Sequence, residues 1–270
     1  MPDPDPTVRF IHADPGPTVG LLSGYLPREL FHAVGCTPVR LFPTAAKPTA
    51  AEAYLPRNFC ALTRLILASF LEDGAPQLDA VIFTDEDDAA RRLYDVWRSH
   101  LPLPAWGFVQ VPRAATPLAA RRYADLLARL SADLEARAGR SLRAAPLRQA
   151  IALFNRQRGL LGNLKRHWLA GYVDTASYRR LRRAALTKAP LVANRQLENT
   201  LAEIESGAPP HPTPPTAAVS PRLLLLAELA APADLVRLVE AAGAQVVAED
   251  SDLDEGDLSA PVPADAETVE

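Results

Sequence analysis

The sequence contains little cysteine: two residues, Cys36 and Cys60, among 270. Two cysteines exclude a network of several disulfides and a four-cysteine zinc or iron–sulfur site. Long hydrophobic runs are also absent, since the longest run of leucines, Leu223–Leu226, has four residues, whereas a membrane-spanning helix requires ~20 apolar residues. The sequence also lacks a P-loop, a dinucleotide-binding glycine fingerprint, a serine nucleophile elbow and a paired-histidine metal motif.

Net charge is low, at −3 with a pI near 6.0, so the chain as a whole is not suited to nucleic acid or anionic membranes. Residues 113–195 nevertheless hold 18 Lys and Arg against four Asp and Glu, a local charge of +14. The arginines alternate with leucines at helical spacing and no set of stacking aromatics accompanies them. We therefore expect no nucleic-acid partner and no membrane association, and two cysteines in apolar surroundings favour a reducing cytoplasm.

Apolar runs alternate with helical periodicity in the first part of the chain, which predicts an α/β fold with a parallel sheet. Helical spacing then dominates from Thr116, and prolines interrupt it after Ser206. The strand and helix pattern resumes at Arg222, before an acidic end with nine Asp and Glu from Glu249 onward. The predicted strands are 18–23, 39–42, 78–83, 105–111, 222–226 and 245–248, and the predicted helices outside the helical middle are 28–34, 58–71, 88–97 and 232–242.

These patterns divide the chain into four parts. We expect an N-terminal α/β domain at 1–115, a helical segment at 116–206, a proline-rich linker at 207–221 and a partial second α/β domain with an acidic tail at 222–270.

One segment of the sequence is distinctive enough to indicate a protein family. From Gly24 to Arg40 the sequence reads GYLPRELFHAVGCTPVR, and it is followed by YLPRNFC at 54–60 and VIFTDEDD at 81–88. The first stretch matches the pattern G-Y-x-P-x-E-L-x-x-A-x-G-x-x-P-x-R and resembles the family of 2-hydroxyacyl-CoA dehydratases and benzoyl-CoA reductases. The resemblance resumes at 222–256, where GAQVV at 243–247 precedes an acidic loop.

The resemblance implies two flavodoxin-like parallel-sheet domains joined by a helical middle segment, with the second domain incomplete here. It also implies a heterodimer with a paralogous subunit, a [4Fe-4S] cluster on three cysteine thiolates and an ATP-hydrolysing activator protein that delivers an electron. The reaction implied is the radical dehydration or reduction of an acyl-CoA-type thioester, in which a ketyl radical expels the hydroxyl group.

The resemblance also suggests site residues. Glu29 corresponds to a glutamate near the active-site mouth and is the catalytic candidate, while Gly24, Tyr25 and Arg40 are the candidates for substrate binding. A second interpretation of Glu29 is that its carboxylate complements the dipole of the helix that begins there.

The sequence departs from the family at the metal ligands. Cys60 occupies the position of the first cluster cysteine, at a helix N-terminus that favours a thiolate. Asp87 and Asp252 stand where the family has the other two cysteines, and carboxylates are hard ligands that suit iron–sulfur clusters poorly. A mononuclear divalent metal on these three residues is an alternative. Two further interpretations involve no metal: the Cys60 thiol is inert, and Asp85–Asp88 form an acidic turn that caps the following helix.

Two hypotheses about function follow. In the first, the chain is a subunit of a dehydratase-like complex and works with a cluster-bearing partner. In the second, it is a non-catalytic, degenerate paralogue that scaffolds or regulates a catalytic subunit. The family's second domain is longer than the part at 222–270, so we expect either a shortened chain or a domain that a partner completes.

Overall fold

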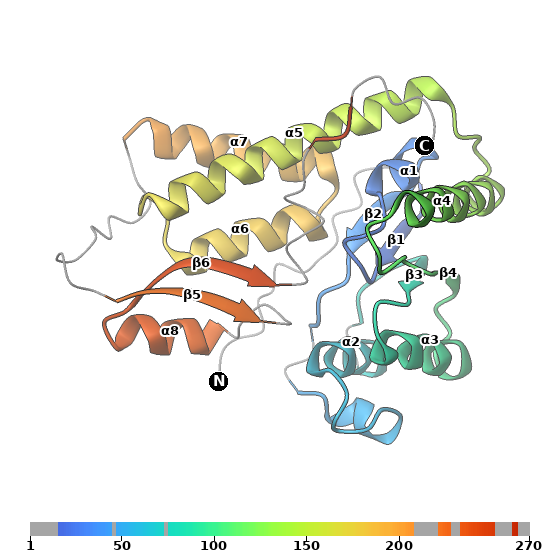
Figure 1. Ribbon diagram of the computed structural model, residues 1–270, viewed down its shortest axis with the longest axis horizontal. Helices are drawn as coiled ribbons and strands as arrows, with labels where there is room; N and C mark the ends of the chain where they lie inside the picture. The colour runs from blue at the N-terminus through green and yellow to red at the C-terminus, as the bar shows by residue number, and fades with distance from the viewer. Residues whose placement is uncertain are drawn as a thin grey trace. The chain divides into compact units, whose positions relative to one another are not determined.

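A computed structural model describes residues 16–44, 47–72, 75–207, 221–227, 233–251 and 261–263 (Figure 1). The chain divides into two compact units. The first comprises 1–154 with the short pieces 187–189 and 262–270, and the second comprises 155–186 and 190–261. The architecture is mixed α/β, as the sequence predicted.

The first unit contains a four-stranded parallel sheet in the order β2-β1-β3-β4. Leu21 at the end of β1 lies opposite Arg40 of β2 on one side and Ile82 of β3 on the other. Every residue of the first three strands is buried, which explains the nearly continuous apolar sequences of β1 and β3. The strands are β1 (Thr18–Leu21), β2 (Thr37–Arg40), β3 (Ala80–Thr84) and β4 (Ala105–Val109).

Helices cover both faces of this sheet. One face, with Val19, Leu21 and Ile82, packs against α1, α4 and the beginning of α5. The other face, with Val81 and Phe83, packs against η1, α2 and α3. The unit therefore has three layers (Figure 1). These helices are α1 (Arg28–Ala33), η1 (Thr49–Ala53), α2 (Ala61–Leu71), α3 (Asp88–His100), α4 (Pro117–Ala138) and α5 (Ala144–Leu169).

Local sequence signals set the helix ends. Helix α1 begins after Pro27 and is followed by Gly35 with a φ of +85°, a left-handed conformation that glycine adopts without strain. A Cβ atom at Gly35 would also lie 2.6 Å from Nη1 of Arg140. Helix α4 begins after its N-cap residue Thr116, whose hydroxyl accepts a hydrogen bond from the Ala119 amide at 3.2 Å.

The second unit has its own core. Trp168 of α5 stacks on Tyr178 of α6 with ring centroids 4.4 Å apart, and Leu197 of α7 packs in the same cluster. Strands β5 and β6 pair in parallel, and Val236 of α8 packs in the cluster with Val246 of β6. The elements are α6 (Thr175–Thr187), α7 (Pro190–Glu205), β5 (Arg222–Ala227), α8 (Ala233–Ala241) and β6 (Gln245–Ser251).

Two details differ from the sequence prediction. The end of the helical segment predicted at 116–206 was not divided into elements, and it forms two helices, α6 and α7, because the second begins at Pro190. Proline has no amide hydrogen for a helix interior, so it favours a new helix start. The short helix η1 was not predicted. Within the described ranges, no helix is both long and apolar enough to cross a membrane.

Candidate functional site

The carboxyl edge of the four-stranded sheet is the candidate site. Strand β2 lies on one side of β1 and strands β3 and β4 lie on the other, so the strand order reverses between β1 and β3. Parallel α/β sheets bind ligands outside the carboxyl ends of the strands at such a reversal. The two segments that leave these strands start side by side, since the Leu22 amide donates to the Ile82 carbonyl at 3.1 Å.

The loop after β1 carries Gly24 and Tyr25. Tyr25 is 47% exposed, and its amide donates to the hydroxyl of the buried Ser23 at 3.0 Å. Its carbonyl accepts a hydrogen bond from the hydroxyl of Tyr123 on α4. Burial, with a smaller effect of Glu86, raises the pKa of Tyr123 to about 12, so the phenol keeps its proton and remains a donor. The loop is therefore held from both sides while the Tyr25 ring stays accessible.

Glu29 and Arg40 are buried. Glu29 lies in the first turn of α1 with 3% of its surface exposed, and Arg40 ends β2 with 2% exposed. Next to Glu29, the guanidinium of Arg28 lies 4.7 Å from the centre of the Phe154 ring. The topology brings Arg40 to the same sheet edge as Gly24 and Tyr25, but burial separates the side chains of Glu29 and Arg40 from solvent.

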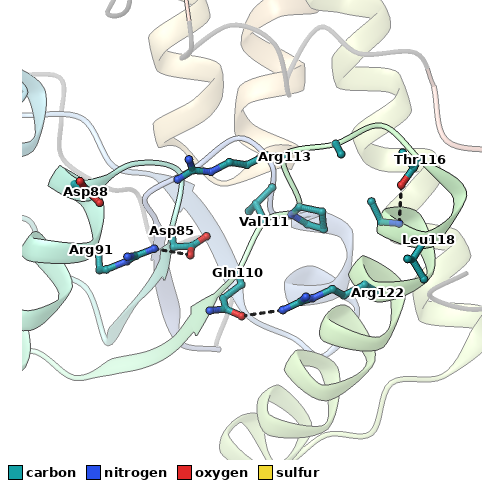
Figure 2. A pocket seen from close by; sticks show the side chains of 12 residues that line it. Asp85, Asp88, Arg91, Gln110, Val111, Arg113, Thr116, Leu118 and Arg122 are labelled. Carbon is teal, nitrogen blue, oxygen red and sulfur yellow. Dashed lines mark hydrogen bonds and ion pairs between the residues drawn. The ribbon is translucent and has the colours of Figure 1, made fainter.

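The acidic segment after β3 is organised by hydrogen bonds. The Thr84 hydroxyl donates to the Glu86 carboxylate at 3.1 Å. Asp85 pairs with Arg91 at 3.1 Å (Figure 2). Asp87 is the N-cap of α3, and its Oδ1 accepts from the Ala90 amide at 2.6 Å. The predicted capping of this helix is confirmed, and the cap occupies one oxygen of Asp87.

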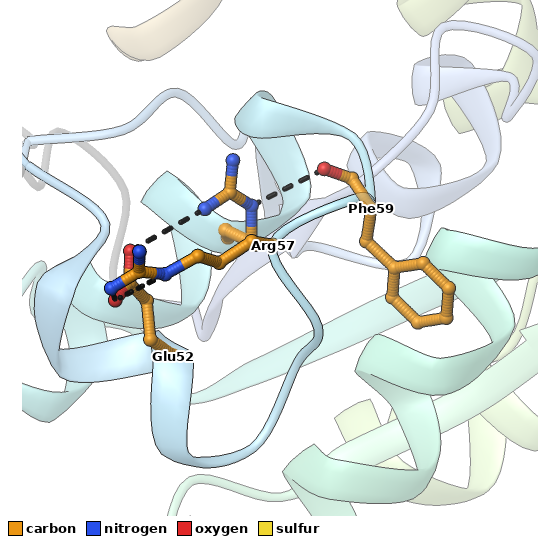
Figure 3. Close-up of polar contacts among 4 residues, drawn as sticks. Glu52, Arg57 and Phe59 are labelled. Carbon is orange, nitrogen blue, oxygen red and sulfur yellow. Dashed lines mark hydrogen bonds and ion pairs between the residues drawn. The ribbon is translucent and has the colours of Figure 1, made fainter.

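Cys60 is the N-cap residue of α2 and is partly exposed. The segment before it is held by two arginines (Figure 3). Arg57 donates two hydrogen bonds to Glu52, at 2.8 and 3.1 Å, and Arg64 donates to the Phe59 carbonyl at 3.2 Å. These contacts fix the backbone that leads into the thiol.

The described residues do not fit a [4Fe-4S] cluster on three thiolates of this chain. The second cysteine of the sequence, Cys36, lies 1% exposed in the core, where burial raises the pKa of its thiol to about 11 and disfavours a thiolate. Asp87 offers a hard carboxylate that already caps a helix. No group of three His, Cys, Asp or Glu side chains in the described ranges is arranged to hold a metal ion, and Asp252 lies outside those ranges.

Part of this edge was not predicted from the sequence. Neither Tyr123 nor an arginine after the fourth strand was among the candidate site residues. That strand is followed by Gln110–Arg113, which lines a cleft of about 700 Å³ beside the acidic segment (Figure 2). The general rule that ligands bind after parallel strands would have drawn attention to these residues.

A family model described as 2-hydroxyglutaryl-CoA dehydratase, D-component, matches residues 23–268. The chain therefore belongs to the 2-hydroxyacyl-CoA dehydratase family, and the resemblance that began with Gly24–Arg40 is confirmed. The match includes both units of the fold, and it supports a role as a subunit of a dehydratase complex. A search of curated proteins found no match to the chain.

Proposed function

We propose that the chain is a subunit of a 2-hydroxyacyl-CoA dehydratase-like complex in which a paralogous partner bears the iron–sulfur cluster. One observation carries this proposal: a family match over residues 23–268 coincides with a sequence of two cysteines, one of them buried in the core. The partner would form a heterodimer with this chain and receive its electron from an ATP-hydrolysing activator. The chain itself would help to bind the acyl-CoA-type thioester.

Accessibility separates the proposed site residues into two groups. Gly24 and the exposed Tyr25 lie where a ligand reaches them from solvent, so we assign substrate contact to this loop. Arg40 and Glu29 are buried, and we assign them a positioning role beneath the loop rather than direct contact.

Cys60 is the one thiol of this chain that is both partly exposed and at a helix N-terminus.

We also propose that the first unit is flavodoxin-like, because the order β2-β1-β3-β4 reproduces four strands of the flavodoxin order. The segment from β5 through α8 to β6 would be the start of a second such domain. The boundaries 1–115, 116–206, 207–221 and 222–270 remain predictions about how the chain is organised.

Iron and acid-labile sulfide, measured on anaerobically purified protein, test the proposal. We expect the isolated chain to lack stoichiometric iron and its complex with a three-cysteine paralogue to contain one cluster. Four irons on the isolated chain would contradict the assignment of the cluster to the partner. Activity of the paralogue that is equal with and without this chain would contradict a shared enzyme.

The Tyr25→Ala variant of the complex distinguishes substrate binding from scaffolding. If the loop contacts the thioester, we expect KM for the acyl-CoA to rise several-fold while the cluster content stays unchanged. Tyr172→Ala is the matched control, since Tyr172 is 55% exposed and belongs to the second unit. A complex that requires the chain but is unaffected by Tyr25→Ala would favour the alternative of a non-catalytic scaffold.

A further inference from the structure

The cleft after β4 lies apart from the residues assigned to the function proposed above. It lies beside the carboxyl ends of β3 and β4, between the start of α3 and the start of α4 (Figure 2). None of Gly24, Tyr25, Glu29, Arg40, Cys60 and Asp87 lines it. Its volume of about 700 Å³ falls within the range of small-molecule sites in proteins.

Three arginines and two aspartates supply the charge of the cleft. Arg91 is paired with Asp85 at 3.1 Å, which leaves Arg113, Arg122 and Asp88. Arg113 reaches only the Glu86 carbonyl at 3.5 Å, and Arg122 reaches the neutral amide oxygen of Gln110 at 3.4 Å. Both contacts are long for hydrogen bonds. Neither contact involves a carboxylate, so both guanidinium groups retain donors for a ligand.

We propose that this cleft binds a phosphate-bearing ligand through Arg113 and Arg122. A guanidinium presents paired N–H donors that match two phosphate oxygens, and two such groups suit a phosphate monoester or a diphosphate. Val111, Pro112 and the largely exposed Leu118 line the same cleft and offer apolar contact to the rest of the ligand. The first turn of α4 contains no acidic residue to oppose an anion.

A phosphate group that binds in this cleft can belong to either of two ligands: a free inorganic anion or a nucleotide-type coenzyme. Calorimetric titration of the full chain with pyrophosphate and, separately, with coenzyme A distinguishes them. We expect pyrophosphate to bind in the micromolar to millimolar range, more weakly as salt rises. Competition of coenzyme A with pyrophosphate identifies the coenzyme as the source, and coenzyme A that leaves pyrophosphate binding unchanged identifies the free anion.

Variants that each remove one positive charge, inside or outside the cleft, locate the site. Arg113→Gln and Arg122→Gln should each weaken pyrophosphate binding by about tenfold, since each removes charge-assisted hydrogen bonds. Arg129→Gln is the control, because Arg129 is an exposed arginine of α4 that does not line the cleft. It should change binding less than about twofold, and thermal melting confirms that all three variants fold.

Wild-type protein that fails to bind pyrophosphate at millimolar concentration would overturn the inference. An equal loss of binding in Arg129→Gln would also overturn it, because attraction to any basic surface would then explain the binding. These measurements use the chain without a partner or iron, so they fail or succeed independently of the dehydratase proposal.

Discussion

At the scale of single residues, two cysteines occupy opposite environments. Cys36 is buried with a pKa raised to about 11, while Cys60 is partly exposed at the N-cap of α2. The thiolate is the reactive form of cysteine, so its accessibility and its pKa decide which thiol reacts.

We expect one of the two thiols to react with iodoacetamide in the native protein at pH 8. About one Cys36 in a thousand is a thiolate at that pH, and its side chain is also covered. Cys60→Ser should abolish the labelling, whereas Cys36→Ser should leave it in place, as peptide mass spectrometry would show. Labelling of Cys36 in the native protein would contradict the burial described above, and denatured protein provides the control with two reactive thiols.

Tyr123→Phe should lower the free energy of unfolding by about 1 kcal/mol, since it removes the hydrogen bond to the Tyr25 carbonyl. It should also change the pH dependence of stability. The folded phenol has a pKa of about 12 and the unfolded one about 10, so the unfolded state releases this proton first and stability is lost between pH 10 and 12. Urea denaturation at pH 8 and pH 11 should show a smaller decline in the variant than in the wild type.

At the scale of elements, a side-chain cap stabilises the start of one helix and an ion pair connects another helix to a strand. The acidic segment at 85–88 provides a cap for α3, and the bidentate pair of Arg179 with Glu249 joins α6 to β6. Glu249 is almost fully buried, with 2% of its side chain exposed. Removal of one partner from such a pair leaves the other charge buried.

Asp87→Ala should destabilise the protein by about 1 kcal/mol because the Ala90 amide loses its acceptor. Asp87→Asn keeps a capping oxygen and should cost far less. Asp88→Ala is the control, since Asp88 is an exposed acid in the first turn of the same helix but is not its N-cap. Thermal denaturation measures all three variants, and equal effects of Asp87→Ala and Asp88→Ala would argue against the cap.

Glu249→Gln should cost about 3 kcal/mol of stability because Arg179 then lacks its buried carboxylate. Glu198→Gln is the matched control in the same unit. It breaks an ion pair with Arg156, whose side chain is 64% exposed, and it should cost less than about 1 kcal/mol. Urea titration of both variants tests the difference, and similar losses would show that burial does not strengthen the first pair.

Elements were also the scale at which the sequence was most informative. The strand at 80–84 follows from a run of apolar residues, and the end of α1 follows from Gly35. The site was less predictable. The burial of Arg40 depends on the pairing of β2 with β1, which no local pattern contains. The cleft at Gln110–Arg113 likewise forms from segments that only the sheet order brings together.

At the scale of the whole molecule, each compact unit has a core of its own. Trp97 and Trp106 lie in the first unit and Trp168 lies in the second. Separate cores predict that unfolding deviates from a single two-state transition.

In the Trp168→Phe variant, tryptophan fluorescence reports on the first unit alone. We expect the urea unfolding curve measured by this fluorescence to differ from the curve measured by far-UV circular dichroism. Glu249→Gln in the same background should shift the circular dichroism curve while the fluorescence curve stays in place, because Glu249 belongs to the second unit. Coincident curves that shift together would instead show one cooperative unit.

The order of the elements along the chain also affects how the protein emerges from the ribosome. All four strands of the first sheet are complete at Val109, but the face with Val19 and Ile82 is covered in part by Leu147, Ala150 and Ile151. Translation from residue 109 to residue 151 takes about 2–8 s at typical rates. During those seconds the nascent sheet presents an incompletely covered apolar face, which is the interval in which a chaperone would bind it.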